Sequence, residues 1–244
     1  MAFIPRHGGS RRPVPGIVYV IPPFLSPSLM PIAFKEWAVT VRALAEGEQL
    51  LTLRKGSTMR DDRKHFELEH DRFFLYPTFE HRRNDVVRAS HQPELRRALE
   101  EGVWPDGEPS AHALTRDGGI PQPERVRLRA WAEVAGHWRV NDPRTIDALS
   151  PYYVWTTDYA EKRLSWRRFQ QTLDVILLRT YRIPRPVTVK VREDFYGNHP
   201  WLEVTRDLPF EGTPVLSDDE FDRASEEIEA IVEGGVIDRT PALV

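Results

Sequence analysis

The chain has 244 residues, of which 40% are hydrophobic and 29% are charged, and its formal net charge at pH 7 is −3. These values are typical of a globular protein with one large domain or two small ones. They argue against a broadly basic nucleic-acid scaffold, although a local basic patch is compatible with them. The absence of cysteine excludes disulfides, thiolate zinc sites and a cysteine nucleophile.

The first 33 residues are rich in Gly, Pro and Arg, and then in Pro and apolar residues. Proline at this density favours extended or irregular backbone, so we expect a tail followed by a strap that lies on the domain. Arg11-Arg12 precedes the apolar run Ile17–Ile21, as in a twin-arginine export signal, but prolines interrupt the run and no small-residue cleavage site follows. No apolar run approaches the roughly 20 residues that span a bilayer. We therefore expect a cytoplasmic protein without membrane contact.

The first half of the chain predicts a hairpin, a charged loop and a short strand. Trp37–Leu44 and Leu50–Arg54 read as two strands joined by a turn over residues 45–48. Residues 57–72 are almost all polar, which predicts a loop, and Phe73–Tyr76 predicts the short strand.

Two helices are expected next. Thr78 can cap a helix over residues 79–88, and Pro93 suits the first turn of a second helix over residues 93–101. Residues 103–124 are rich in Pro, Gly and Asp, which predicts a loop and a weak boundary.

The second half predicts strands and a C-terminal helix. A continuous apolar run in residues 174–181 is typical of a strand buried on both faces. Ser217–Glu220 forms a capping box, an apolar stripe follows, and Gly234-Gly235 ends the helix. The remaining expected elements are strands at 126–134, 152–156, 187–191 and 201–205, a helical turn at 147–149 and a brief helix at 158–163 capped by Asp158.

Together these elements predict an α+β fold, with a mixed or mainly antiparallel, partly curled sheet and peripheral helices at 79–88 and 93–101. An amphipathic C-terminal helix occupies 217–233. The expected organisation is a Pro/Gly-rich N-terminal tail and strap (1–33), a single α+β domain (34–210), and a C-terminal helix and tail (211–244).

The first candidate site consists of Arg54, Lys55, Thr78 and His81, of which the first three are the predicted phosphate-binding residues. Arg54 and Lys55 end a predicted strand at Gly56, and Thr78 opens a predicted helix whose free N–H groups attract anions. Arginine offers a two-pronged donor for phosphate and lysine a point charge. The pattern predicts phosphate binding; the alternative is a hairpin end with ordinary surface charges.

Glu67, His70 and His81 form the second candidate site, together with neighbouring acids in the charged loop. Carboxylates and imidazoles suit zinc, manganese or magnesium, so we predict these three residues as ligands of a divalent metal. His70 and His81 are alternatively acid–base groups in catalysis. Their spacing matches no zinc signature, and a solvated charged loop is the competing interpretation.

Aromatic and arginine residues alternate in the second half, as they do on surfaces that stack on bases. More often such tryptophans are core residues covered by the arginines, and we assign Trp155 and Trp201 to the core.

Several segments resemble a prokaryotic family described as domain of unknown function 1802. They are Phe34–Val39, Arg54-Lys55-Gly56, His70, Phe74–Thr78 with His81, Val154–Thr156, Arg163–Trp166, Leu178–Tyr181, and Tyr196-Gly197 with Trp201. The resemblance runs from about Phe34 to Thr205, implies one unit rather than two, and carries no established activity. Ser57 stands where the family pattern predicts a second glycine, so the loop after Lys55 differs from it.

A weaker resemblance links Gly47–Arg54 to the small-strand motif of the activating-signal-cointegrator homology barrels. It implies an RNA-related β-barrel.

These observations favour a protein that recognises phosphate on a nucleic acid or nucleotide, and single strands are the expected nucleic-acid partner. A more specific hypothesis is that the protein also hydrolyses this substrate with the help of a metal ion. The alternative is a non-catalytic interaction module that binds a protein or RNA partner. Metal content distinguishes the two.

Overall fold

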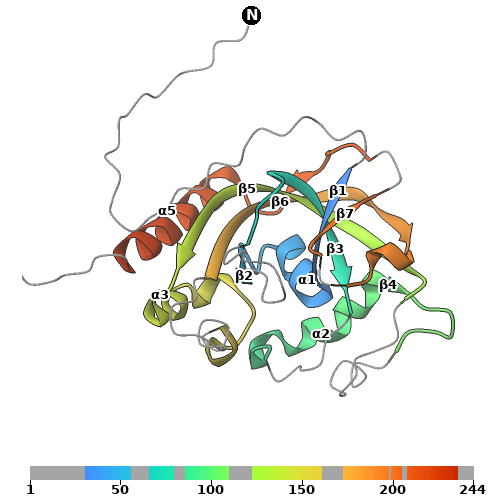
Figure 1. Ribbon diagram of the computed structural model, residues 1–244, viewed down its shortest axis with the longest axis horizontal. Coiled ribbons are helices and arrows are strands. Elements are labelled where there is room, and N and C mark those ends of the chain that lie inside the picture. The colour runs from blue at the N-terminus through green and yellow to red at the C-terminus, as the bar shows by residue number, and fades with distance from the viewer. Residues whose placement is uncertain are drawn as a thin grey trace, which may run out of the picture.

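The computed structural model describes residues 31–55, 66–79, 86–109, 123–160, 173–197, 199–204 and 208–235. In these residues a strongly curved sheet holds helix α1 (Ala38–Glu46) on its concave side (Figure 1). Every residue of α1 from Ala38 to Ala45 is buried, because the helix contacts the sheet on one side and a second helix on the other.

The sheet is mixed and mainly antiparallel, as predicted. Its strand order is β2-β6-β5-β3-β1-β7, and β1–β3 is the parallel pair in this path. The short strands β4 and β8 pair with β5 and β6, respectively. The strands are β1 (Ile32–Trp37), β2 (Leu51–Lys55), β3 (Arg72–Thr78), β4 (Gly102–Val103), β5 (Arg125–Val140), β6 (Leu173–Lys190), β7 (Trp201–Glu203) and β8 (Thr213–Pro214).

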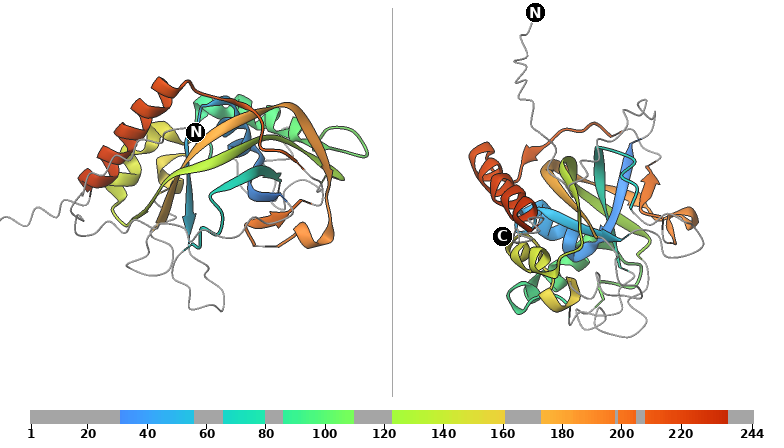
Figure 2. Two further views of the ribbon diagram at one scale, coloured as in Figure 1. Left: turned by 90° about the horizontal axis from the view of Figure 1, so that it is seen from above. Right: turned by 60° about the vertical axis from the view of Figure 1, so that its left-hand side comes forward.

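Strands β5 and β6 run side by side through most of the sheet (Figure 2). Their register shifts between Leu128 and Ala130 and again between Val134 and Gly136, and such bulges bend a sheet and increase its twist. The strands predicted at 174–181 and 187–191 are parts of the single strand β6. The strand predicted at 126–134 continues to Val140.

The predicted hairpin of Trp37–Leu44 with Leu50–Arg54 is wrong. The first segment is helix α1, which ends at Gly47 with a left-handed φ of 79°. Its β-branched residues imitate a strand, and its complete burial removes the polar face that reveals a surface helix. Strand β2 therefore pairs with β6 instead.

Two further predictions are corrected. The helix expected over 79–88 is absent at Phe79 and at 86–88, where Val87 instead bridges to Trp155; residues 80–85 lie outside the described residues. The strand expected at 152–156 is also absent, since Tyr152 ends a 3-10 turn and Trp155 forms an isolated bridge.

Helices at the periphery follow the sequence more closely. Helix α2 (Gln92–Ala98) and the 3-10 turn η2 (Leu99–Glu101) occupy the predicted 93–101 segment. Helix α3 (Pro143–Ala148) begins after its cap Asp142, four residues before the expected turn. Residues 157–160 are helical, and the Thr156 hydroxyl, rather than Asp158, caps them. The other 3-10 turns are η1 (Ala89–His91), η4 (Ser150–Tyr152) and η5 (Glu193–Phe195).

Helix α5 (Asp218–Gly235) confirms the amphipathic C-terminal helix and packs beside α3 at one end of the molecule (Figures 1 and 2). The Ser217 hydroxyl accepts from the Glu220 N–H, and the Glu220 carboxylate accepts from the Ser217 N–H at 2.9 Å, which is a capping box. Phe221, Ile228 and Val232 are buried in the core. Among the described residues, no helix combines the length and apolarity needed to cross a membrane.

Candidate functional site

The curl of the sheet brings Arg54 on β2 against β1, although three strands separate β2 from β1 in the sheet order. Its guanidinium contacts the Glu36 carboxylate at 2.9 Å, donates to the Lys35 carbonyl, and lies over the Phe34 ring at 4.2 Å. The Arg54 side chain is 20% exposed. Arg54 therefore closes the curled sheet and also reaches its surface.

Thr78 ends β3, and its hydroxyl donates to the Glu36 carbonyl at 3.1 Å. Arg54 and Thr78 thus meet at the same residue of β1. Lys55 ends β2 and is half-buried. The structure thus brings Arg54 and Thr78 together at Glu36, and Lys55 follows Arg54 in the chain; the phosphate-binding role of the three residues stays a prediction.

His70 lies in the extended segment that leads into β3, with its ring edge-on to Trp201 at 5.0 Å. Burial lowers the pKa of His70 below its usual value, and the nearby carboxylates of Glu69 and Asp71 oppose that shift. His70 is therefore a neutral imidazole near pH 7. Trp201 is half-buried and packs on Phe34, in line with its assignment to the core.

The predicted metal ligands are only partly placed. Glu67 is exposed, His70 is half-buried, and His81 lies outside the described residues. Within the described ranges, carboxylate oxygens gather at ligand spacing at Glu46, Glu48 and Glu94, a group without Glu67 or His70.

Asp174 is the centre of a polar cluster that the sequence did not reveal. It is fully buried and is the second residue of β6, where its neighbours are apolar. Its carboxylate accepts from His137 Nε2 at 2.8 Å, from Arg139 Nε at 3.3 Å and from the Phe66 N–H at 3.1 Å. An aspartate inside the most apolar strand of the chain was the available signal, since a buried carboxylate needs partners.

The register of the sheet explains how this cluster meets Arg54. Asp174 lies directly opposite Arg54 on β2 and directly opposite Arg139 on β5. Residues directly opposite on antiparallel strands point to the same face, so the three side chains form one row across β2, β6 and β5. Arg139 is 25% exposed and Asp174 is not exposed, so the row presents positive charge outward over an internal negative charge.

His137 lies beside this row and is buried. Its Nε2 bonds to Asp174, and its Nδ1 is buried without a hydrogen-bond partner among the described residues. Trp201 Nε1 is a buried donor that likewise lacks a partner in that part of the chain. These two buried polar atoms could each bond to a polar ligand or a water molecule.

Aromatic rings support the row from inside. Phe34, Phe66, Phe73 and Trp201 contact one another with ring centroids 4.7–6.2 Å apart. These apolar rings stiffen the strand ends that carry the charged groups.

The chain is similar to solved structures of ASCH from Zymomonas mobilis. One is ASCH itself, with 9% identity, a TM-score of 0.37, and coverage of 82% of this chain and 94% of that chain. One mutant form of the same protein has 9% identity and a TM-score of 0.36, and the match covers 81% of this chain and 95% of that chain. A second mutant form has 8% identity and a TM-score of 0.35, and the match covers 81% of this chain and 97% of that chain.

A comparison with curated proteins gave no match. The model of the family described as "Domain of unknown function (DUF1802)" matches residues 33–227, which include all the segments from which this resemblance was inferred. The chain belongs to the DUF1802 family.

Proposed function

We propose that the protein recognises phosphate groups of a single-stranded nucleic acid or nucleotide at a basic rim formed by Arg54, Lys55 and Arg139. The observation that carries the proposal is the row of Arg54, Asp174 and Arg139 across three strands. Two part-exposed guanidinium groups flank one buried carboxylate: Arg139 pairs with Asp174, and Arg54 pairs with Glu36. Guanidinium groups fixed in this way lose little side-chain entropy on binding phosphate.

Neighbouring groups favour a nucleotide over a simple anion. Trp201 is half-buried beside Phe34, on which Arg54 stacks, and its Nε1 has no partner among the described residues. A part-exposed indole beside cations suits a base attached to the bound phosphate. Thr78 adds a hydroxyl at the end of β3.

A more specific version of the same proposal is that the protein hydrolyses the phosphate ester that it binds. In it His70, neutral near pH 7, and His81 act as acid–base groups, or bind a divalent metal together with Glu67. A metal bound there would supply an ionised water and stabilise charge on the phosphate. The location of His70 next to Trp201 supports its place near the rim.

A non-catalytic interaction module is the second candidate. It is favoured by the contacts that Arg54 and Thr78 both make with Glu36, because these contacts stabilise the closure of the sheet without any ligand. In this case the same surface contacts a protein partner.

Fluorescence anisotropy with a labelled single-stranded oligonucleotide at low and moderate salt tests the proposal. The logarithm of the binding constant should fall against the logarithm of the salt concentration with a slope of about −2. This is the slope expected when roughly three phosphates of a single strand are neutralised. Changing Arg54 and Lys55 together to alanine should abolish it. Arg139→Ala should weaken it while leaving the Glu36 contact intact, and Arg96→Ala, an exposed site on α2, is the matched control.

Thermal unfolding of each variant shows whether the sheet remains closed. A folded wild-type protein that binds no oligonucleotide or nucleotide at low salt would remove nucleic acid and leave the interaction module. Binding that survives in both rim variants but depends on Arg96 would move the site to α2.

A further inference from the structure

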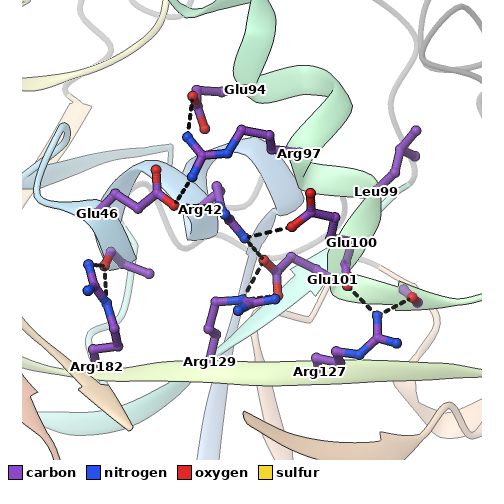
Figure 3. Close-up of polar contacts among 12 residues, drawn as sticks. Arg42, Glu46, Glu94, Arg97, Leu99, Glu100, Glu101, Arg127, Arg129 and Arg182 are labelled. Atoms are coloured by element: carbon purple, nitrogen blue, oxygen red, sulfur yellow. Dashed lines mark hydrogen bonds and ion pairs between the residues drawn. The ribbon is translucent and has the colours of Figure 1, made fainter. Parts of the chain in front are cut away.

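A second polar cluster joins the C-terminal half of α1 to α2 and η2 (Figure 3). Arg97 on α2 contacts Glu46 at 2.6 Å and Glu94 at 2.9 Å. Arg42 contacts the same Glu46 at 2.6 Å, but it also pairs with Glu101 at 3.0 Å. The cluster lies at the opposite end of α1 from Glu36 and the basic rim.

Three carboxylates converge at the edge of this cluster. One oxygen atom from each of Glu46, Glu48 and Glu94 lies within 4.8 Å of the other two. Glu46 and Glu94 come from α1 and α2, and Glu48 follows the glycine that ends α1. Oxygen atoms at this separation can reach one ion of the size of Ca²⁺, which binds carboxylates at about 2.3–2.6 Å.

Glu94 supplies an independent observation. It is 7% exposed; one carboxylate oxygen accepts from Arg97, but Oε2 is inaccessible to solvent and has no hydrogen-bond partner among the described residues. A buried carboxylate oxygen without a hydrogen-bond partner costs free energy, because its contacts with water have been lost and no group among the described residues replaces them. A bound cation would satisfy it.

Charge in the cluster is not balanced by its own arginines. Arg97 is shared between Glu46 and Glu94, while Arg42 is divided between Glu46 and the acids of η2. The His91 ring lies 3.8 Å from the Glu48 carboxylate. Burial and the neighbouring Glu94 and Glu46 carboxylates raise the pKa of Glu48, and His91 and Arg97 only partly oppose this.

We propose that Glu46, Glu48 and Glu94 bind a hard divalent cation, such as Ca²⁺ or Mn²⁺, that fastens α1 to α2. Carboxylate oxygens are the ligands such cations prefer, and the site differs from the predicted ligand set of Glu67, His70 and His81. Because α1 fills the concave side of the sheet, the cation would stabilise the scaffold rather than take part in phosphate binding.

Calorimetric titration of chelator-treated full-length protein with MnCl₂ and with CaCl₂ tests this site. We expect saturable binding of one cation per chain at pH 7.5, a higher thermal midpoint with the cation, and weaker binding at pH 5.5, where protons compete for the carboxylates. Glu48→Gln should lower the affinity at least about tenfold, the smaller of the losses seen when groups supporting a metal are removed. Glu48 is exposed, so the variant should fold, and Glu226→Gln on the exposed face of α5 is the matched control.

A proton shared between Glu48 and Glu94 is the competing explanation of the cluster. In that case Glu48→Gln raises the thermal midpoint in chelator, and neither protein responds to added cation. That result would overturn the proposal, as would binding that is equal in wild type and Glu48→Gln. Glu94→Gln gives a second check, since its loss of cation binding with a normal fold would confirm the buried ligand.

Discussion

Glu101 is the residue at which loss of one charge should most reduce the stability of the fold. Its side chain is fully buried, and it accepts from Arg42 at 3.0 Å and from Arg129 at 2.8 and 2.9 Å (Figure 3). Glu101→Gln keeps the shape of the side chain and one oxygen atom but removes the negative charge. Two guanidinium groups are then left without the negative charge that they share.

The size of the effect follows from how far each arginine can recover. Removing one member of a buried ion pair costs roughly 3–5 kcal/mol, because the remaining charge stays desolvated. Arg42 retains Glu46 at 2.6 Å, and the Arg129 side chain is 26% exposed and can reach water. We therefore expect the lower end, about 3 kcal/mol. For a chain of this size that loss lowers the thermal midpoint by about 6–12 °C.

Urea unfolding followed by tryptophan fluorescence measures this loss directly. The matched control is Asp194→Asn, which removes the same charge from the solvent-exposed pair of Asp194 with Arg192 and should leave the urea midpoint unchanged. If Glu101→Gln unfolded at the same urea concentration as Asp194→Asn, the buried network would not stabilise the contact between η2 and the sheet, and the reasoning would be refuted.

Three further perturbations test separate parts of the fold. Ser217→Ala should reduce the free energy of unfolding by about 1 kcal/mol, the usual cost of a lost helix cap; identical urea midpoints would show that the cap is not used. Burial lowers the pKa of His70 from 6.5, so the folded protein takes up this proton less readily than the unfolded chain. The free energy of unfolding should therefore keep its full value above about pH 6.5 and decrease as the pH falls through the folded-state pKa. In urea midpoints measured from about pH 7.5 to 5, His70→Asn should make this decrease smaller. Gly136→Ala should cost about 1–3 kcal/mol in thermal unfolding, because the added Cβ would lie 2.0 Å from the buried Trp138 ring; an unchanged midpoint would mean that the ring moves aside freely.

Short sequence patterns, such as a capping box or a terminal glycine, correctly predicted the elements in which they occur. The capping box at Ser217 and the glycines after residue 233 place α5 to within two residues. Strand β2 matches its alternating pattern within one residue at either end. These elements depend on interactions between residues that are close in the sequence, so the sequence itself predicts them.

Helix α1 shows where such reading fails. Val39, Thr40 and Val41 favour strand locally, and burial on all sides erased the polar face. One helical signal was present: Arg42 and Glu46 stand four residues apart and form an ion pair at 2.6 Å. In this segment tertiary packing stabilises a helix although the local sequence favours a strand.

The candidate site was predictable only in part, because most of it depends on strand register. Arg54 and Thr78 were recognised from strand ends, yet their common contact, Glu36, was not. Asp174 joins Arg54 and Arg139 through two pairings that no local pattern encodes. The fourth participant, His137, was missed because β5 extends six residues beyond its predicted end at 134.

The pairing of β1 with β7 has a consequence for synthesis on the ribosome. Lys35 donates to the Gly197 carbonyl, 162 residues later, and Phe34 pairs with Trp201. At a translation rate of about 5–20 residues per second, roughly 10–30 s pass between the appearance of the two segments. During that interval one edge of β1 waits without its neighbour, and an unpaired edge is a site for mispairing with other nascent chains. The strand that holds Arg54 through the Lys35 carbonyl and the Glu36 carboxylate can therefore be completed on this edge only after residue 203 has been synthesised.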